Sequence, residues 1–150
     1  MRPVIVLSHR FVEFIPEDDE LEERTLYISL RFGTATHKCC CGCGLPVVTP
    51  LRPTDWRLDF DGKTVSLYPS IGNWSFPCRS HYWIRESRVA WAADWSQGQI
   101  ERGRAFDKKA KERYFGTAET GAAEESTMPV PDVGPVLTWW QRFIKWLFGP

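Results

Sequence analysis

Cysteine is the residue type whose spacing in this chain most clearly indicates chemistry. Four of the five cysteines lie within five positions, and the set is Cys39, Cys40, Cys41, Cys43 and Cys78. An odd count and such close spacing argue against ordinary disulfides, which need Cα atoms about 4.4–6.8 Å apart. Thiolates are the ligands that structural zinc prefers, usually four Cys or His residues. The pattern therefore predicts a metal site.

The spacing defines two ligand pairs. Cys40 and Cys43 form a C-x-x-C pair followed by glycine, and Cys78 and His81 form a C-x-x-H pair. Glycine permits the tight turn that zinc knuckles use. We therefore predict one structural Zn²⁺ held by Cys40, Cys43, Cys78 and His81.

The register inside the cysteine cluster stays open. Cys39, Cys41 and Cys43 occupy alternate positions, so they would share one face of an extended segment. Cys39 and Cys41 are therefore alternative ligands. His37, three residues before Cys40, is expected to be a strand residue or to donate a hydrogen bond to a thiolate.

Short strands must position these residues. Apolar and β-favouring residues predict strands over 11–15, 25–31 and 34–38, and a short apolar segment over 45–49. One hairpin is predicted from 56–60 and 64–68 around Asp61-Gly62, a favoured two-residue turn. A second hairpin joins 82–85 and 88–92, and residues 69–73 are predicted as a loop.

The C-terminal third has a different pattern. Ser96 and Gln99 resemble a capping box, and helical spacing of apolar residues predicts a helix over 97–114. Gly, Ala, Thr, Glu and Pro predict a flexible linker over 116–135, and residues 136–150 predict a Trp-rich amphipathic tail helix. The expected fold is mainly β (α+β): a small antiparallel β domain over 1–115, organised by zinc and closed by one helix.

The composition excludes several classes of protein. The 19 Lys and Arg balance 19 Asp and Glu, so no global positive field attracts nucleic acid or an anionic membrane. A hydrophobic share of 43% excludes wholesale disorder, and the 8 Trp, 9 Phe and 4 Tyr suit a small β core. No apolar run reaches the roughly 20 residues of a membrane span, and the first residues do not form a secretory signal. We expect a cytoplasmic protein.

The stretch Phe11–Tyr114 resembles a bacterial domain-of-unknown-function family of small Cys/His zinc-binding-like proteins. The segments that carry the resemblance are Phe11–Pro16, Leu26–Ser29, Cys40–Gly44, Val47–Leu51, Pro53–Trp56, Pro69–Trp74 and Pro77–Trp83. Genes of this family often lie beside those for ubiquitin-like proteins and relatives of ubiquitin-activating and ubiquitin-conjugating enzymes. The resemblance implies zinc binding and a role in ubiquitin-like protein modification, and it transfers no catalytic residue.

From these features we expect a zinc-binding adaptor or ligase-like module of such a pathway, not an enzyme. The alternatives are a zinc- or cysteine-dependent enzyme, in which Cys39 or Cys41 acts as nucleophile, and a nucleic-acid-binding zinc protein using the basic face of the 97–114 helix. The expected partners are the ubiquitin-like protein and the E1/E2-like enzymes, by gene neighbourhood alone. Self-association through the tail is a further expectation, and integral membrane insertion is not expected.

Overall fold

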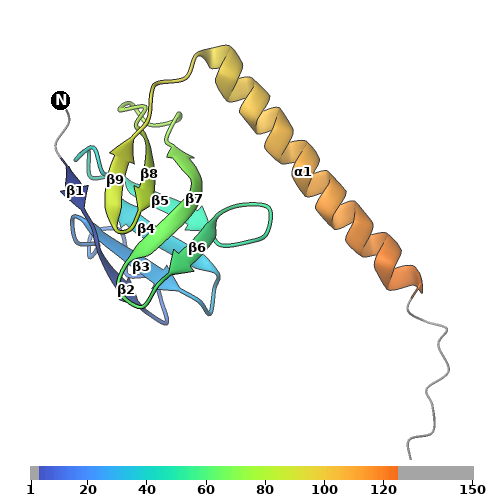
Figure 1. Cartoon of the computed structure of the whole chain (residues 1–150), viewed down its shortest axis with the longest axis horizontal. Coiled ribbons are helices and arrows are strands. Elements are labelled where there is room, and N and C mark those ends of the chain that lie inside the picture. Colours follow the sequence, from blue (N-terminus) through green and yellow to red (C-terminus); the bar gives the residue numbers. More distant parts are fainter. Residues whose placement is uncertain (1–3, 125–150) are drawn as a thin grey trace, which may run out of the picture. The chain divides into compact units, whose positions relative to one another are not determined.

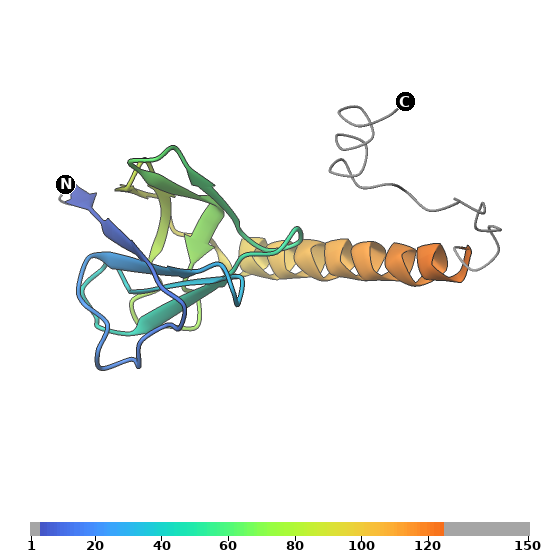
Figure 2. The same ribbon diagram turned by 90° about the horizontal axis from the view of Figure 1, so that it is seen from below.

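The chain folds into two facing β-sheets followed by one helix (Figure 1). The computed structural model describes residues 4–124, with side chains from residue 4 to residue 116. Along these residues the elements are β1 (Ile5–Val6), β2 (Ser8–Phe11), β3 (Thr25–Ser29), β4 (Thr34–Lys38), β5 (Pro46–Pro50), β6 (Arg57–Phe60), β7 (Val65–Gly72), β8 (His81–Arg85), β9 (Arg88–Trp91) and α1 (Gln97–Glu124). One sheet has the order β1-β9-β8-β7-β6 and the other β2-β3-β4-β5. Figure 2 shows them as two separate layers.

The predicted mainly β fold with one following helix is confirmed. The strand expected over 34–38 is β4, and the two predicted hairpins are β6–β7 and β8–β9. The N-terminal strand differs from the prediction, because β2 covers Ser8–Phe11 and pairs in parallel with β3. β1 has only two residues, too few to show a periodicity.

β7 is longer than predicted. Residues 69–72, expected in a loop, continue the strand to Gly72. Proline is usually excluded from a sheet interior because it cannot donate to the ladder. Pro69 lies just past Tyr68, the last residue of β7 that pairs with β6. At that position a missing N–H removes no bond to β6, and the register shift between Leu67 and Ile71 leaves Pro69 unpaired with β8, so the strand tolerates the proline.

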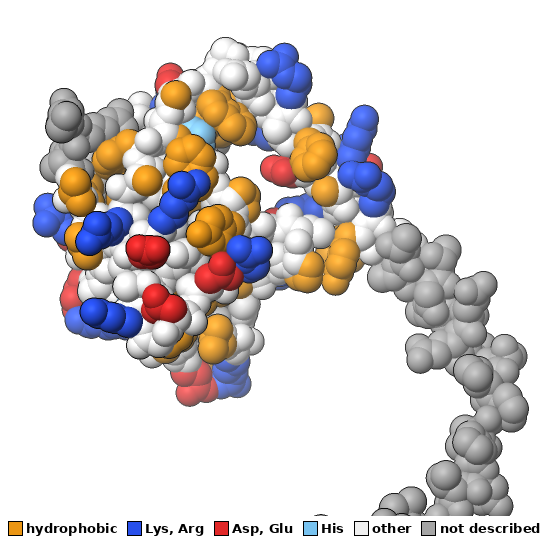
Figure 3. All heavy atoms as spheres, viewed as in Figure 1, with side chains coloured by type: hydrophobic (Ala, Val, Ile, Leu, Met, Phe, Trp, Pro, Cys, Tyr) orange, Lys and Arg blue, Asp and Glu red, His pale blue; other side chains and the backbone are white. Residues whose placement is uncertain are grey.

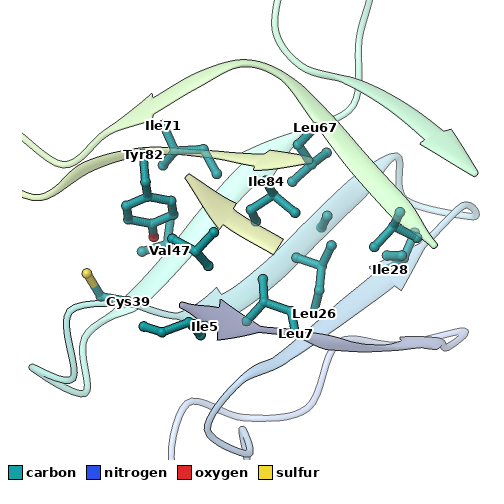
Figure 4. Packing of buried hydrophobic residues seen from close by; sticks show 13 residues of the cluster. Ile5, Leu7, Leu26, Ile28, Cys39, Val47, Leu67, Ile71, Tyr82 and Ile84 are labelled. Atoms are coloured by element: carbon teal, nitrogen blue, oxygen red, sulfur yellow. The ribbon is translucent and has the colours of Figure 1, made fainter. Parts of the chain in front are cut away.

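The core lies between the two sheets (Figure 4). Along β7 and β8, Ile71, Tyr82 and Ile84 point inward and are at most 2% exposed. Side chains alternate along a strand, so the neighbouring residues of β7 and β8 face the outer surface of that sheet. This outer row contains Ser70 of β7 and His81 of β8.

The helix begins with the predicted capping box. The Ser96 backbone N–H donates to Gln99 Oε1 at 2.8 Å, and the Gln99 N–H donates to Ser96 Oγ at 3.4 Å. α1 then continues to Glu124, beyond the predicted end at 114, so the predicted linker over 116–135 begins inside a helix. The predicted tail helix over 136–150 lies outside the described residues. No helix in the described part of the chain is long and apolar enough to cross a bilayer.

Candidate active site and metal centre

Four cysteine thiols meet where the β4–β5 connection approaches the β7–β8 connection. Cys39 directly follows β4, Cys41 and Cys43 lie in the β4–β5 connection, and Cys78 lies in the β7–β8 connection. Their Sγ atoms all lie within 4.8 Å of one another. The cluster thus joins one connection from each sheet.

The distances between these thiols suit a tetrahedral metal. Sγ of Cys39 lies 3.4 Å from that of Cys41 and 3.9 Å from that of Cys78, and Cys43 lies 3.9 Å from Cys78. A tetrahedral zinc with Zn–S bonds of about 2.3 Å separates its sulfurs by roughly 3.8 Å. Four sulfurs would complete the coordination shell, as in structural sites rather than catalytic ones. These four residues are therefore able to hold a metal ion.

The structure brings together only part of the favoured ligand set. Cys43 and Cys78 lie in the cluster, and the two alternatives Cys39 and Cys41 join them. Cys40 is half-buried against the core, and burial raises the pKa of its thiol to about 12. His81, the other favoured ligand, is also outside the cluster and bonds elsewhere.

Buried polar groups support the cluster from inside the domain. Ser80 Oγ lies 3.0 Å from Cys39 Sγ, and Asn73 Nδ2 donates to Ser80 Oγ at 2.9 Å. Asn73 Nδ2 also lies 3.5 Å from the hydroxyl of Tyr82, which bonds His37 Nε2 at 2.9 Å. His37 therefore contacts a tyrosine instead of a thiolate, and burial lowers its pKa to about 4, which keeps it neutral.

His81 and Ser70 form a hydrogen-bonded pair on the outer face of β7 and β8. His81 Nε2 lies 2.9 Å from Ser70 Oγ, and His81 Nδ1 lies 2.8 Å from the carbonyl oxygen of Ala93. A carbonyl only accepts, so Nδ1 carries a proton, and in the neutral imidazole Nε2 is then the acceptor for the serine hydroxyl. A histidine held in this way can remove the proton of a serine that attacks a carbonyl carbon.

Three tryptophans surround this histidine. The ring centroids of Trp74, Trp95 and Trp83 lie 4.9, 5.1 and 5.7 Å from that of His81. Trp74 also stacks on Trp95 at 5.6 Å. As a result His81 is only 4% exposed although it lies on the outer face of the sheet. The aromatic rings exclude water from the imidazole on these sides and fix its orientation.

Arg79 holds residues 93–95 in place, and this segment orients His81. Its Nη2 donates to the carbonyl oxygen of Trp95 at 3.1 Å and lies 3.5 Å from Asp94 Oδ1. Its guanidinium also lies 5.6 Å from the ring centre of Trp74. The segment so held contains the Ala93 carbonyl, so Arg79 positions the group that accepts from His81 Nδ1.

A cavity of about 470 Å³ gives access to the pair. Ser70, Gly72, Trp74 and His81 line it, and Trp95 and residues of α1 complete the wall. Lys111 of α1 pairs with Asp55 at 2.6 Å at the same cavity. The serine–histidine pair therefore opens onto a space large enough for a peptide segment.

Comparison with known proteins adds a family to this geometry. The family model described as bacterial ubiquitination-like system serine protease (BubE) matches residues 11–92, more than half of the chain. The chain belongs to this family. No curated protein and no solved structure matches it. The matched range contains Ser70 and His81 as well as all five cysteines.

Membership of the BubE family corrects the expectation of a non-catalytic module. The family is named as serine proteases, so the prediction that this chain is not an enzyme was wrong. The prediction of a link to bacterial ubiquitin-like modification is confirmed at the level of the pathway. The error has a physical cause, because the C-x-x-H spacing of Cys78 and His81 suits a metal ligand, whereas the folded chain turns His81 away from the thiols and toward Ser70.

The sequence contained a signal for the face on which Ser70 lies, but its meeting with His81 depends on the strand register. If residues 69–72 are read as strand, Ser70 and Gly72 share a face opposite to Ile71. His81 pairs directly with Gly72 across the β7–β8 ladder, which places it on that same face. An apolar Ile71 and a buried Tyr82 then fix which face is inward, leaving the serine and the histidine together on the other.

Proposed function

We propose that this protein is a serine protease in which Ser70 is the nucleophile and His81 is the general base. The observation that carries the proposal is the 2.9 Å contact between Ser70 Oγ and His81 Nε2, with Nδ1 held by a backbone carbonyl. The family name supports the reaction class, and the adjacent cavity supplies room for the substrate.

The chemistry follows from these contacts. Ser70 Oγ forms a bond to the substrate carbonyl carbon while its proton moves to His81 Nε2. The amine leaves with that proton when the peptide C–N bond breaks, and an acyl-serine ester remains. Water then attacks the ester and gives a proton to Nε2, and this proton returns to Oγ as the acid product leaves. The Ala93 carbonyl stabilises the transient imidazolium as a hydrogen-bond acceptor.

We further propose that Cys39, Cys41, Cys43 and Cys78 hold one structural Zn²⁺. A closed set of four thiolates supplies no open position for substrate, so its contribution is to fold stability. It would tie the β7–β8 connection, which separates Ser70 from His81, to the opposite sheet. Thiolate ligands need a reducing environment, which supports the cytoplasm as the working compartment.

The substrate class that we propose follows from the bacterial ubiquitination-like system in the family description. The substrates that we propose are a ubiquitin-like protein or its conjugates, and the E1/E2-like enzymes are partners in the pathway instead of substrates. Support comes from the family description alone. Figure 3 shows Lys/Arg and Asp/Glu interspersed on the face it presents, so that face has no one-signed patch that would favour nucleic acid.

The proposal is tested with a ubiquitin-like protein of a bacterial ubiquitination-like system that carries a C-terminal extension. We expect wild-type protein to cleave it and Ser70→Ala and His81→Gln each to lower kcat by roughly 10⁴-fold or more. Ser66→Ala is the matched control, because Ser66 lies on the same strand but bonds the Glu86 N–H instead of His81. Equal cleavage by Ser70→Ala and wild type would contradict the assignment.

A further inference from the structure

β7 has an edge that no strand of the described chain covers. Within the five-stranded sheet β7 lies between β8 and β6. The β6 pairing ends at Tyr68, opposite Arg57, whereas the β8 pairing shifts register after Leu67 and resumes at Ile71 and Gly72, opposite Tyr82 and His81. Among the described residues, Ile71 and Gly72 therefore pair with a strand on one side only, and nothing pairs with them on the β6 side.

The chain before β6 turns away from this edge. A longer β6 would place residues 53–56 beside Pro69–Gly72, but the Trp56 N–H donates to the carbonyl oxygen of Pro50 in β5 at 3.0 Å. The cavity of about 470 Å³ occupies the place that the longer strand would fill. Residues 54–56 line one side of it and Pro69, Ser70 and Gly72 line the other.

The peptide groups at this edge point into the gap. Ile71 pairs with Tyr82 of β8, and the Asn73 N–H donates to the carbonyl oxygen of Ser80 at 2.8 Å. Successive residues of a strand direct their N–H and C=O groups to opposite sides. The N–H and C=O of Gly72, between these two residues, therefore point away from β8 and toward the cavity, two residues from the nucleophile.

We infer that the substrate binds as an extended segment that adds to β7 beside Gly72. This inference rests on the proposed protease function and deepens it. Main-chain hydrogen bonds to Gly72 would align the segment, and the same alignment brings a peptide carbonyl to Ser70. Only a segment with unpaired main-chain groups can bind in this way. The substrate class is therefore a protein terminus or linker without secondary structure, instead of a folded strand or helix.

A shallow apolar groove continues from this edge. It shares Trp56 and Pro69 with the cavity and is also lined by Leu51, Leu58 and Tyr68. An extended segment cannot keep pairing beyond Pro69, because β6 occupies the edge from Tyr68 onward. It would pass over Pro69 into the groove, where apolar side chains of the substrate would be buried.

The test uses a library of random eight-residue peptides and the full-length protein, with cleavage sites read by mass spectrometry. The best-cleaved peptide is then resynthesised with each backbone amide N-methylated in turn. We expect alternate amides on one side of the scissile bond to lower kcat/KM at least about tenfold, because a strand presents every second peptide group to its neighbour. The intervening amides are the matched controls.

Labelling of Ser70 by a fluorophosphonate, which needs no peptide contacts, separates the two claims. If Ser70 is labelled but methylation has no alternating effect, the strand-addition inference is wrong and the protease assignment stands. If Ser70 is labelled and no library member is cut, the inference is also wrong, since free extended peptides should bind. If neither labelling nor cleavage occurs, both claims fail.

Discussion

Replacing Gly72 by alanine is the most informative perturbation of the three tryptophans, Trp74, Trp83 and Trp95, that surround His81. A Cβ atom at this position would lie 2.4 Å from Trp74 Nε1 and 2.6 Å from Trp74 Cε2. These separations are far below van der Waals contact, so the indole must move. Trp74 contacts both Trp95 and His81, at centroid distances of 5.6 and 4.9 Å. Gly72→Ala should therefore loosen the packing that orients the catalytic histidine.

The expected cost is that of overpacking, about 1–3 kcal/mol. For a domain of this size that corresponds to a fall in Tm of roughly 4 °C or more per kcal/mol. The fluorophosphonate labelling rate of Ser70 should fall as well. In a Trp74→Ala background the clash is absent, so Gly72→Ala should cost much less there than in wild type.

The assays are thermal unfolding followed by circular dichroism and the time course of labelling. Gly116→Ala is the control glycine variant, because open space surrounds its added Cβ in α1. An unchanged Tm and labelling rate for Gly72→Ala would refute the packing argument. An equal loss of stability in the Trp74→Ala background would also refute it, since the indole would then not be the cause.

Four further predictions concern the rest of the domain. Metal analysis of purified protein should find one zinc per chain. Cys78→Ser should lose the zinc and unfold, whereas Cys40→Ser should keep it because Cys40 lies outside the cluster. Zinc loss in both variants, or in neither, would contradict the ligand set. Tyr82→Phe removes the hydroxyl that bonds His37 Nε2 and should lower the free energy of unfolding, measured by urea denaturation, by about 1–3 kcal/mol. Tyr68 is half-exposed, so Tyr68→Phe should change this free energy little. Equal effects of the two substitutions would count against the buried network. Arg79→Ala should slow fluorophosphonate labelling of Ser70 while leaving the zinc content intact, and a normal labelling rate would show that Arg79 does not position the Ala93 carbonyl. Limited proteolysis should cut first between Gly116 and Pro135, and first cuts inside 56–92 would refute the predicted domain boundary.

The hairpins and the helix start could be predicted from sequence because their signals are local. Asp61-Gly62 fixes one turn, and the Asp61 carboxylate accepts the Lys63 N–H at 2.8 Å. Ser96 and Gln99 cap α1 through contacts three residues apart. Turns and helix caps depend on residues that are close in sequence, so they can be predicted from short stretches of the sequence.

The active site could not be read in the same way because it depends on strand pairing. Ser70 and His81 lie eleven residues apart and meet through the β7–β8 ladder. Residues 69–72 contain proline and glycine, which are typical of loops, and this hid the strand alternation. His81 also stands three residues after Cys78, a spacing that equally suits a zinc ligand. The sequence allows His81 to be either a zinc ligand or a general base, and only the tertiary structure distinguishes these two roles.

The cysteine cluster shows an intermediate case. Its existence followed from composition, since four thiols within five positions rarely serve packing alone. Its register did not, because the path of the β4–β5 connection, with Gly42 and Gly44 both at positive φ, brings Cys39, Cys41 and Cys43 together and leaves Cys40 outside the cluster. The choice between Cys39 or Cys41 and Cys40 is decided by that turn. Sequence spacing alone allowed either set.

The most direct test of the central claim is the intact mass of the protein after reaction with a fluorophosphonate, followed by peptide mapping. The catalytic account predicts one phosphonyl group per chain, attached to Ser70, with no adduct in Ser70→Ala or His81→Gln and a normal adduct in Ser66→Ala. An adduct on another serine, or none on folded wild-type protein, would contradict the assignment of Ser70 and His81 as nucleophile and base.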